Sequence, residues 1–290
     1  MSWLEKKIEY NNKKRSIKSG IPWLVAGVII ALIIIVLLTI LIPYSESKGV
    51  SVIHIEGTIE TGDFYSGGYV GSEYVGSRIR QAADDPLVEA IVLRVDSPGG
   101  SPVGAQEINE DVQYAKTKKP VFVSMGDMAT SAAYYISAYA DKIYASPDTL
   151  TGSIGTIWTF IDTSRSLQIE GVNASIVKSG DMKDLTSQYR GLTDEEQEYV
   201  QAMVDESFER FLDDALSQRN ISREDVEEAK LYRGEDAYDL GLIDEYGNLF
   251  ETIEAAKNYE RPVAVIEMEV NETTGNETAM TTENGTEIAG

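Results

Sequence analysis

The sequence contains no cysteine and only one histidine, His54, among its 290 residues. Without cysteine there is no disulfide scaffold, no thiol nucleophile and no zinc site with cysteine ligands. One histidine excludes a metal site built from several histidines, and a Ser-His-Asp triad would have to use His54. No G-x-x-x-x-G-K-S/T loop for nucleotide phosphates is present. We therefore expect hydrolytic chemistry, if there is any, to use Ser, Thr, Lys, Asp, Glu or Tyr, with no metal or other cofactor.

Positive charge is scarce outside the N-terminus. Residues 1–20 carry six Lys/Arg and two Asp/Glu, residues 21–43 carry no charge, and the remainder carries 19 Lys/Arg and 46 Asp/Glu. The balances of +4 and −27 give the formal net charge of −23. An acidic body repels phosphates, which argues against nucleic acid as a partner.

The uncharged run from Ile21 to Ile42 predicts a membrane anchor. Its 22 residues would form a helix of about 33 Å, which is long enough to cross a bilayer core. Trp23 and Tyr44 lie near its ends, where interfacial aromatic side chains are favoured. Four basic residues just before the run place the N-terminus in the cytoplasm and residues 44–290 outside, in a protein of the cell membrane.

A cleaved signal peptide is the alternative for this run. The run is longer than the usual apolar core of a signal peptide, and Ile42-Pro43-Tyr44 is a poor cleavage site. We therefore expect five parts. These are a basic cytoplasmic N-terminus (1–20), a transmembrane helix (21–43), a linker (44–49), an extracytoplasmic domain (50–270) and a disordered tail (271–290). Five Asn-X-Ser/Thr sequons follow the span, and the sequence leaves open whether they are glycosylated: Asn173, Asn220, Asn271, Asn276 and Asn284.

Apolar, strand-like runs alternate with turns and helical patterns through the outer body. Such alternation predicts an α/β fold with largely parallel strands. Thr193 to Glu196 has the pattern of a capping box, which predicts a long helix from there to about Arg219. Strands are expected at 50–56, 88–95, 120–126, 141–147 and 174–180, and further helices at 105–116, at 130–140 and from Ser222. His54 lies inside the first strand and is given no catalytic role.

Two turns carry residues suited to acyl-transfer chemistry. Asp96–Gly100 (DSPGG) follows a buried strand and precedes a helix, and its glycines leave backbone amides uncovered for a developing oxyanion. Pro-Gly-Gly is equally an ordinary turn. Ser131 follows the next strand at the start of a helix, where free N–H groups stabilise negative charge. A serine there can be a nucleophile or simply an N-cap.

A serine nucleophile needs a general base, and the segment Lys178–Asp184 offers lysines. A lysine serves as a base only after its ammonium has lost its proton, which burial and the lack of a carboxylate partner both favour. Asp181 and Asp184 would oppose this loss if they faced Lys183. The alternative is a solvated, charged loop.

The combination of DSPGG, MATSAAYYISAYADKIYASPDTLTGSIG and KSGDMKD resembles signal peptide peptidase A, a family of membrane-bound serine peptidases with a Ser/Lys dyad. The resemblance runs from about residue 50 to residue 255. It implies that Ser131 is the nucleophile and that Lys183, 52 positions later, is the base. This spacing is longer than in the related stomatin-associated peptidases.

The resemblance also implies the other members of the site. The amides of Gly99 and Ala132 would form the oxyanion hole, and the hydroxyl of Ser153 would orient the lysine. Family members often carry Gly-Gly after the nucleophile, whereas Ala132 and Ala133 stand here. A methyl group should leave the backbone amide accessible, although it could reshape the adjacent cleft.

The fold implied is the Clp/crotonase type, a repeated β-β-α superhelix. The implied assembly is a homo-oligomeric ring, an octamer for a chain of this length, in which Ser and Lys can meet across a protomer boundary. The implied substrates are apolar peptides such as signal peptides left in the membrane after preprotein processing. Two alternatives stay open: a catalytically inactive, membrane-tethered scaffold of the same fold, and a crotonase-like acyl-CoA enzyme. A membrane-protein peptidase of the stomatin-associated type is a further alternative.

Overall fold

The computed structural model describes residues 2–41 and 48–260, without the side chains of 12–26 and 38–41. The chain divides into one unit at Met1–Asn258 and a second at Tyr259–Gly290, and 261–290 of the second lie outside the described residues. The predicted linker at 44–49 falls largely outside the described residues, and the predicted disordered tail falls there entirely.

The first element is the helix α1 (Trp3–Leu41), which contains most of the predicted membrane span. Its described apolar side chains between Val28 and Leu37 are each about half exposed. Within the described residues, no helix combines the length and the apolar composition that a membrane crossing requires.

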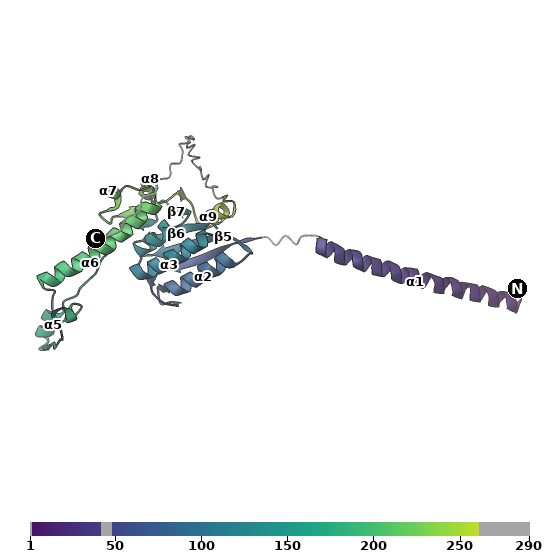
Figure 1. The fold of residues 1–290 in the computed structure, drawn as a ribbon, viewed down its shortest axis with the longest axis horizontal. Helices are drawn as coiled ribbons and strands as arrows, with labels where there is room; N and C mark the ends of the chain where they lie inside the picture. Colours follow the sequence, from purple (N-terminus) through teal and green to yellow (C-terminus); the bar gives the residue numbers. More distant parts are fainter. Residues whose placement is uncertain (1, 42–47, 261–290) are drawn as a thin grey trace, which may run out of the picture. The chain divides into compact units, whose positions relative to one another are not determined.

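The body is an α/β fold with a mostly parallel sheet, as the sequence predicts (Figure 1). The main sheet has the order β1-β5-β6-β7-β10, and β8 extends it by pairing with both β6 and β9. A small second sheet has the order β2-β4-β3. The strands are β1 (Gly49–Glu56), β2 (Thr58–Glu60), β3 (Tyr65–Ser66), β4 (Tyr69–Gly71), β5 (Val88–Ser97), β6 (Val121–Thr130), β7 (Lys142–Ala145), β8 (Leu150–Gly152), β9 (Leu231–Arg233) and β10 (Glu245–Tyr246).

Helices cover the central strands, which is why these strands are apolar on both faces. Leu93 of β5 and Val123 of β6 are fully buried. In Figure 1, α2 and α3 lie side by side across the sheet, and both contact its strands. The remaining helices are α2 (Ser72–Asp84), α3 (Pro102–Lys116), α4 (Ala132–Ala138), α5 (Ser164–Ile169), the 3-10 turn η1 (Asp181–Asp184), α6 (Asp194–Gln218), α7 (Arg223–Val226), α8 (Gly234–Asp239) and α9 (Leu249–Lys257).

Local sequence signals set several helix starts. Ser101 caps α3 by accepting a hydrogen bond from the amide of Gly104, and Pro102 occupies the first helical position. The predicted capping box of α6 is confirmed, because Thr193 and Glu196 each accept a hydrogen bond from the other's backbone amide.

Two differences between the predicted elements and the structure concern the candidate site. The strand expected at 174–180 is wrong: these residues are exposed and irregular, and Val177 is 100% exposed. A strand needs a neighbour for its backbone hydrogen bonds, and among the described strands none pairs with this segment. The helix expected from Thr130 starts later, at Ala132, because β6 continues through Thr130 by pairing with β8.

Candidate active site

Ser131 occupies the junction between β6 and α4. Its φ of 53° and ψ of −126° lie in a region that glycine prefers. Its backbone amide donates to the carbonyl of Gly152 at 2.9 Å, which holds the junction against β8. Its hydroxyl makes no capping hydrogen bond to α4, and Ser131 lines a cavity, so the hydroxyl is available to a substrate. A strained residue between a strand and a helix is a common setting for a nucleophile.

Gly99 lies directly against this junction. Its φ is +103°, and a Cβ added to it would stand 2.8 Å from the Cβ of Ser131 and 2.9 Å from the amide nitrogen of Ala132. Only glycine fits so close to the serine. Ala132 begins α4, so its amide has no carbonyl one turn earlier within the helix. The structure therefore brings the three predicted residues together.

The amide of Gly99 already has an acceptor in this structure. It donates to the hydroxyl of Ser97 at 3.1 Å, and Ser97 is buried. An oxyanion role would require the Gly99 amide to share this hydrogen bond or to turn toward the substrate.

Hydrogen bonds tie the turn of Gly99 to the strand end that carries Ser131. Asp96 accepts the amide of Met128 at 3.1 Å, and the hydroxyl of Thr130 donates to the carbonyl of Pro98 at 3.0 Å. The amide of Ile59 in β2 donates to the carbonyl of Gly99 at 2.9 Å and so supports the loop from its other side. Because both turns are fixed to strands, Gly99 and Ser131 keep a defined separation.

Ser153 directly follows β8, as Ser131 directly follows β6. The register pairs Thr130 with Gly152, so the residues that come next, Ser131 and Ser153, leave neighbouring strands together. Ser153 also has a positive φ, 51°, and its amide donates to the carbonyl of Lys230 at 2.7 Å. This place suits a hydroxyl that acts beside Ser131.

A cavity of about 80 Å³ opens at Ser131. Ala132, Tyr135, Ile157 and Phe211 contribute to its lining, which gives it a partly apolar wall. The rings of Tyr135 and Phe211 lie 4.6 Å apart between their centroids, and the hydroxyl of Tyr135 donates to Asp214 of α6. Burial, and then this hydrogen bond, raise the pKa of Tyr135 well above its ordinary value, so its ring stays neutral.

Lys183 lies in η1 and is not part of this cavity. Its side chain is exposed, and its Nζ makes no hydrogen bond or ion pair with a described residue. The structure of one chain therefore assembles Gly99, Ser131, Ala132 and Ser153 but does not bring Lys183 to them. His54, which was given no catalytic role, lies in β1 and pairs with Glu56 at 2.7 Å.

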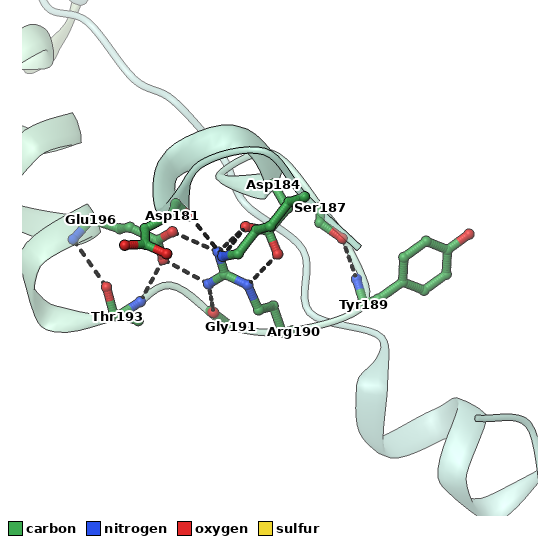
Figure 2. Close-up of polar contacts among 9 residues, drawn as sticks. Asp181, Asp184, Ser187, Tyr189, Arg190, Gly191, Thr193 and Glu196 are labelled. Atoms are coloured by element: carbon green, nitrogen blue, oxygen red, sulfur yellow. Dashed lines mark hydrogen bonds and ion pairs between the residues drawn. The ribbon is translucent and has the colours of Figure 1, made fainter. Parts of the chain in front are cut away.

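Sequence reasoning missed the surroundings of Lys183. Arg190 joins Asp184, the neighbour of the lysine, to Glu196 at the start of α6 (Figure 2). The capping box placed Glu196 correctly, but the sequence holds no signal that an arginine six residues from each carboxylate connects the two. The cavity walls were missed as well, because Tyr135 and Phe211 come from helices far apart in the chain.

The sequence matches the model of peptidase family S49 over residues 113–263, a range that includes Ser131, Ser153 and Lys183. The chain belongs to this family. It is 34% identical to Protease 4 of Haemophilus influenzae over 218 residues, which cover 74% of this chain and 35% of that protein. It is also 34% identical to Protease 4 of Salmonella typhi over 253 residues, which cover 82% of this chain and 41% of that protein.

A plant relative and a solved structure are also similar. The chloroplastic serine protease SPPA of Arabidopsis thaliana is 29% identical over 213 residues, covering 72% of this chain and 31% of that protein. A membrane-bound stomatin-specific protease of known structure has a TM-score of 0.45 and 18% identity, covering 71% of this chain and 83% of that one. The chain thus spans 31% to 41% of the length of the three relatives compared by sequence.

Proposed function

We propose that the protein is a membrane-anchored serine endopeptidase that hydrolyses apolar peptides with a dyad of Ser131 and Lys183. The observation that carries the proposal is the position of Ser131. It is a strained serine with a free hydroxyl, packed against Gly99 and opening on a cavity. Membership of a peptidase family supports the reaction class.

The proposed reaction proceeds in two stages. The neutral amine of Lys183 takes the proton from Ser131 as Oγ attacks the scissile carbonyl carbon, and the amides of Gly99 and Ala132 stabilise the oxyanion. The tetrahedral intermediate collapses, the C–N bond breaks, and the ammonium of Lys183 gives its proton to the leaving amine. Water then adds to the acyl-enzyme, losing a proton to Lys183, and this proton returns to Ser131 as the peptide acid leaves.

The base is proposed to come from another copy of the chain in a ring-like oligomer. Two observations support this arrangement: Lys183 does not line the cavity at Ser131, and apolar side chains are exposed on the segment that carries it. Ile157 is 86% exposed, Ile169 81% and Val177 100%. Burying such side chains against a second copy would remove apolar area from water. We further propose that the ring is an octamer and that each chain has the Clp/crotonase superhelix fold.

The partly apolar lining of the cavity favours apolar peptides, and we propose remnant signal peptides as the physiological substrates. An N-terminal anchor over residues 21–43 would hold the site near such substrates and raise their effective concentration. The uncharged run in the sequence, preceded by basic residues, supports an anchor with a cytoplasmic N-terminus and an extracytoplasmic peptidase domain.

The proposal is tested by co-expressing Ser131→Ala and Lys183→Ala chains of the full protein. Each variant alone is expected to be folded and inactive on an apolar peptide. If serine and lysine come from neighbouring copies, random mixing in a closed ring regenerates intact pairs at about a quarter of the sites. Mixed rings that stay inactive would place the dyad within one chain, and full turnover by either single variant would refute the dyad. A folded, assembled wild type without turnover would favour the scaffold hypothesis.

A further inference from the structure

The turn that carries Lys183 is held by its next residue, Asp184. Arg190 donates to this carboxylate through Nε at 2.8 Å and through Nη2 at 2.7 Å, a two-pronged contact that fixes both oxygens. Lys178 adds a third hydrogen bond at 2.7 Å. The side chain of Asp184 is only 9% exposed. Both oxygens of Asp184 therefore accept hydrogen bonds from Arg190 or Lys178.

The same guanidinium reaches the start of α6 (Figure 2). Its Nη1 donates to Glu196 at 2.7 Å, and the Glu196 side chain is 3% exposed. Glu196 also accepts the backbone amide of Thr193 at 2.9 Å as part of the capping box. Arg190 thus bridges the 3-10 turn of Lys183 and the first turn of a helix of 25 residues.

The charges of this cluster balance. Arg190 and Lys178 supply two positive charges, and Asp184 and Glu196 supply two negative charges. The Arg190 guanidinium, followed by Lys178, holds the pKa of Asp184 well below its usual range. Hydrogen bonds from Arg190 and then from Thr193 lower the pKa of Glu196 to about 2.

The amine of Lys183 is left out of these pairs. Within the described residues it contacts neither Asp184 nor any other carboxylate. Other charged groups around the turn are Asp181, whose carbonyl accepts from Lys178, and the acidic first turn of α6 with Asp194 and Glu195. Asp184 is the acid adjacent to Lys183 in sequence, and a carboxylate on the amine would favour the protonated form, which cannot act as a base.

We propose that Arg190 is a positioning residue for Lys183. By binding both Asp184 and Glu196, Arg190 fixes the turn of Lys183 to α6 and keeps the carboxylate of Asp184 away from the amine of Lys183. This inference rests on the proposed function of Lys183. It adds a role that the motif KSGDMKD alone does not contain, since Arg190 lies outside it.

The test measures kcat and KM of the full chain on an apolar peptide between about pH 6 and about pH 11, a range that spans a titrating lysine. Arg190→Gln is expected to lower kcat about tenfold with little change in KM, because the base is displaced rather than the substrate. It is also expected to move the rise of activity to higher pH by about one unit, because Asp184 is released toward the amine.

A second substitution separates charge from position. Adding Asp184→Asn to Arg190→Gln removes the released carboxylate, so the rise of activity should return to its wild-type pH while kcat stays low. Arg223→Gln is the matched control, since Arg223, at the start of α7, also donates to a carboxylate of α6, Glu209, at 2.6 Å. We expect this control to keep the wild-type pH profile and kcat.

Two results would overturn the inference: an Arg190→Gln profile that matches the Arg223→Gln profile, or a displaced rise that persists in the double variant. Should Arg190→Gln fail to give a cooperative thermal transition, Arg190→Lys replaces it, because lysine keeps the charge and loses the two-pronged contact. A lowered kcat is then expected, and a wild-type kcat would overturn the clamp. A wild type whose turnover does not depend on Ser131 would instead refute the proposed function.

Discussion

Ser131 and Ser153 leave two paired parallel strands side by side, and both have a positive φ, 53° and 51°. The amide of Ser131 donates to the carbonyl of Gly152, the residue before Ser153. Two neighbouring non-glycine residues in this conformation store backbone strain, which the surrounding sheet must offset. Ser131 therefore lies between β6 and α4, and Ser153 lies at the start of the loop after β8.

Replacing Ser131 by glycine is expected to yield a more stable protein than replacing it by alanine. Both variants lack the hydroxyl and should be inactive, but glycine adopts the native φ and ψ without strain. We expect the free energy of unfolding of Ser131→Gly to exceed that of Ser131→Ala by about 1 kcal/mol. Denaturant unfolding of the two variants measures the difference. Equal stability would mean that the backbone at this junction is not strained.

Gly99→Ala is expected to lower turnover strongly. The new Cβ would stand 2.8 Å from the Cβ of Ser131, so the turn must shift away from Ser131. Loss of one oxyanion donor lowers kcat by about a hundredfold or more. Gly67→Ala is the matched control, since Gly67 has a φ of +63° and open space around its Cα. Steady-state kinetics should show a loss of kcat for Gly99→Ala alone. Comparable kcat values in the two variants would contradict the proposed role of the Gly99 amide in the oxyanion hole.

Acid should destabilise the protein partly through Glu196. Arg190 and Thr193 lower its pKa to about 2 in the folded protein, below its value of about 4.3 in an unfolded chain. A depressed pKa stabilises the fold above the unfolded value, and this contribution is lost as the pH falls toward 2. Thermal unfolding of Glu196→Gln should therefore show a lower Tm at neutral pH and a smaller fall in Tm between about pH 5 and about pH 2.

The control for this prediction is Glu224→Gln, which removes an exposed carboxylate from the first turn of α7. Its dependence of Tm on pH should follow that of the wild type. If Glu196→Gln also followed the wild type, the ion pair with Arg190 would have no effect on stability.

Asn109 is a buried polar side chain without a described partner. It lies in α3 with 3% of its surface exposed, and neither its amide nitrogen nor its oxygen has a hydrogen bond. Leucine has the same branching and avoids the cost of an unpaired polar group, so Asn109→Leu is expected to stabilise the fold by about 1 kcal/mol. Denaturant unfolding tests this. Destabilisation of similar size would show that the site is too small for the two methyl groups.

The sequence predicts the architecture well where patterns are local. Apolar runs identify the strands that hold Leu93 and Val123, and the box from Thr193 to Glu196 identifies the start of α6. The positions of Gly99, Ser131 and Ser153 relative to one another depend on strand register, which periodicity does not determine. The turn patterns indicate Gly99 and Ser131 separately, and the family resemblance joins them with Ser153 in one site.

The segment around Lys183 was the hardest to predict. Its segment Ala174–Val177 (ASIV) has the composition of a strand, but no described strand pairs with it. In the proposed oligomer another copy would cover this run, and a single sequence contains no sign of a partner's geometry. The clamp of Arg190 depends on a loop closing onto α6, which is likewise a tertiary contact.

Labelling with a fluorophosphonate probe tests the proposed dyad most directly, because the probe reacts preferentially with an activated serine hydroxyl. The full-length wild type, Ser131→Ala and Lys183→Ala would be treated alike, and the adduct located by mass spectrometry of proteolytic peptides. We expect one adduct, on Ser131, in the wild type and none in either variant. The proposal would be contradicted if the adduct on Ser131 formed in Lys183→Ala as fast as in the wild type. It would also be contradicted if a folded wild type took up no probe.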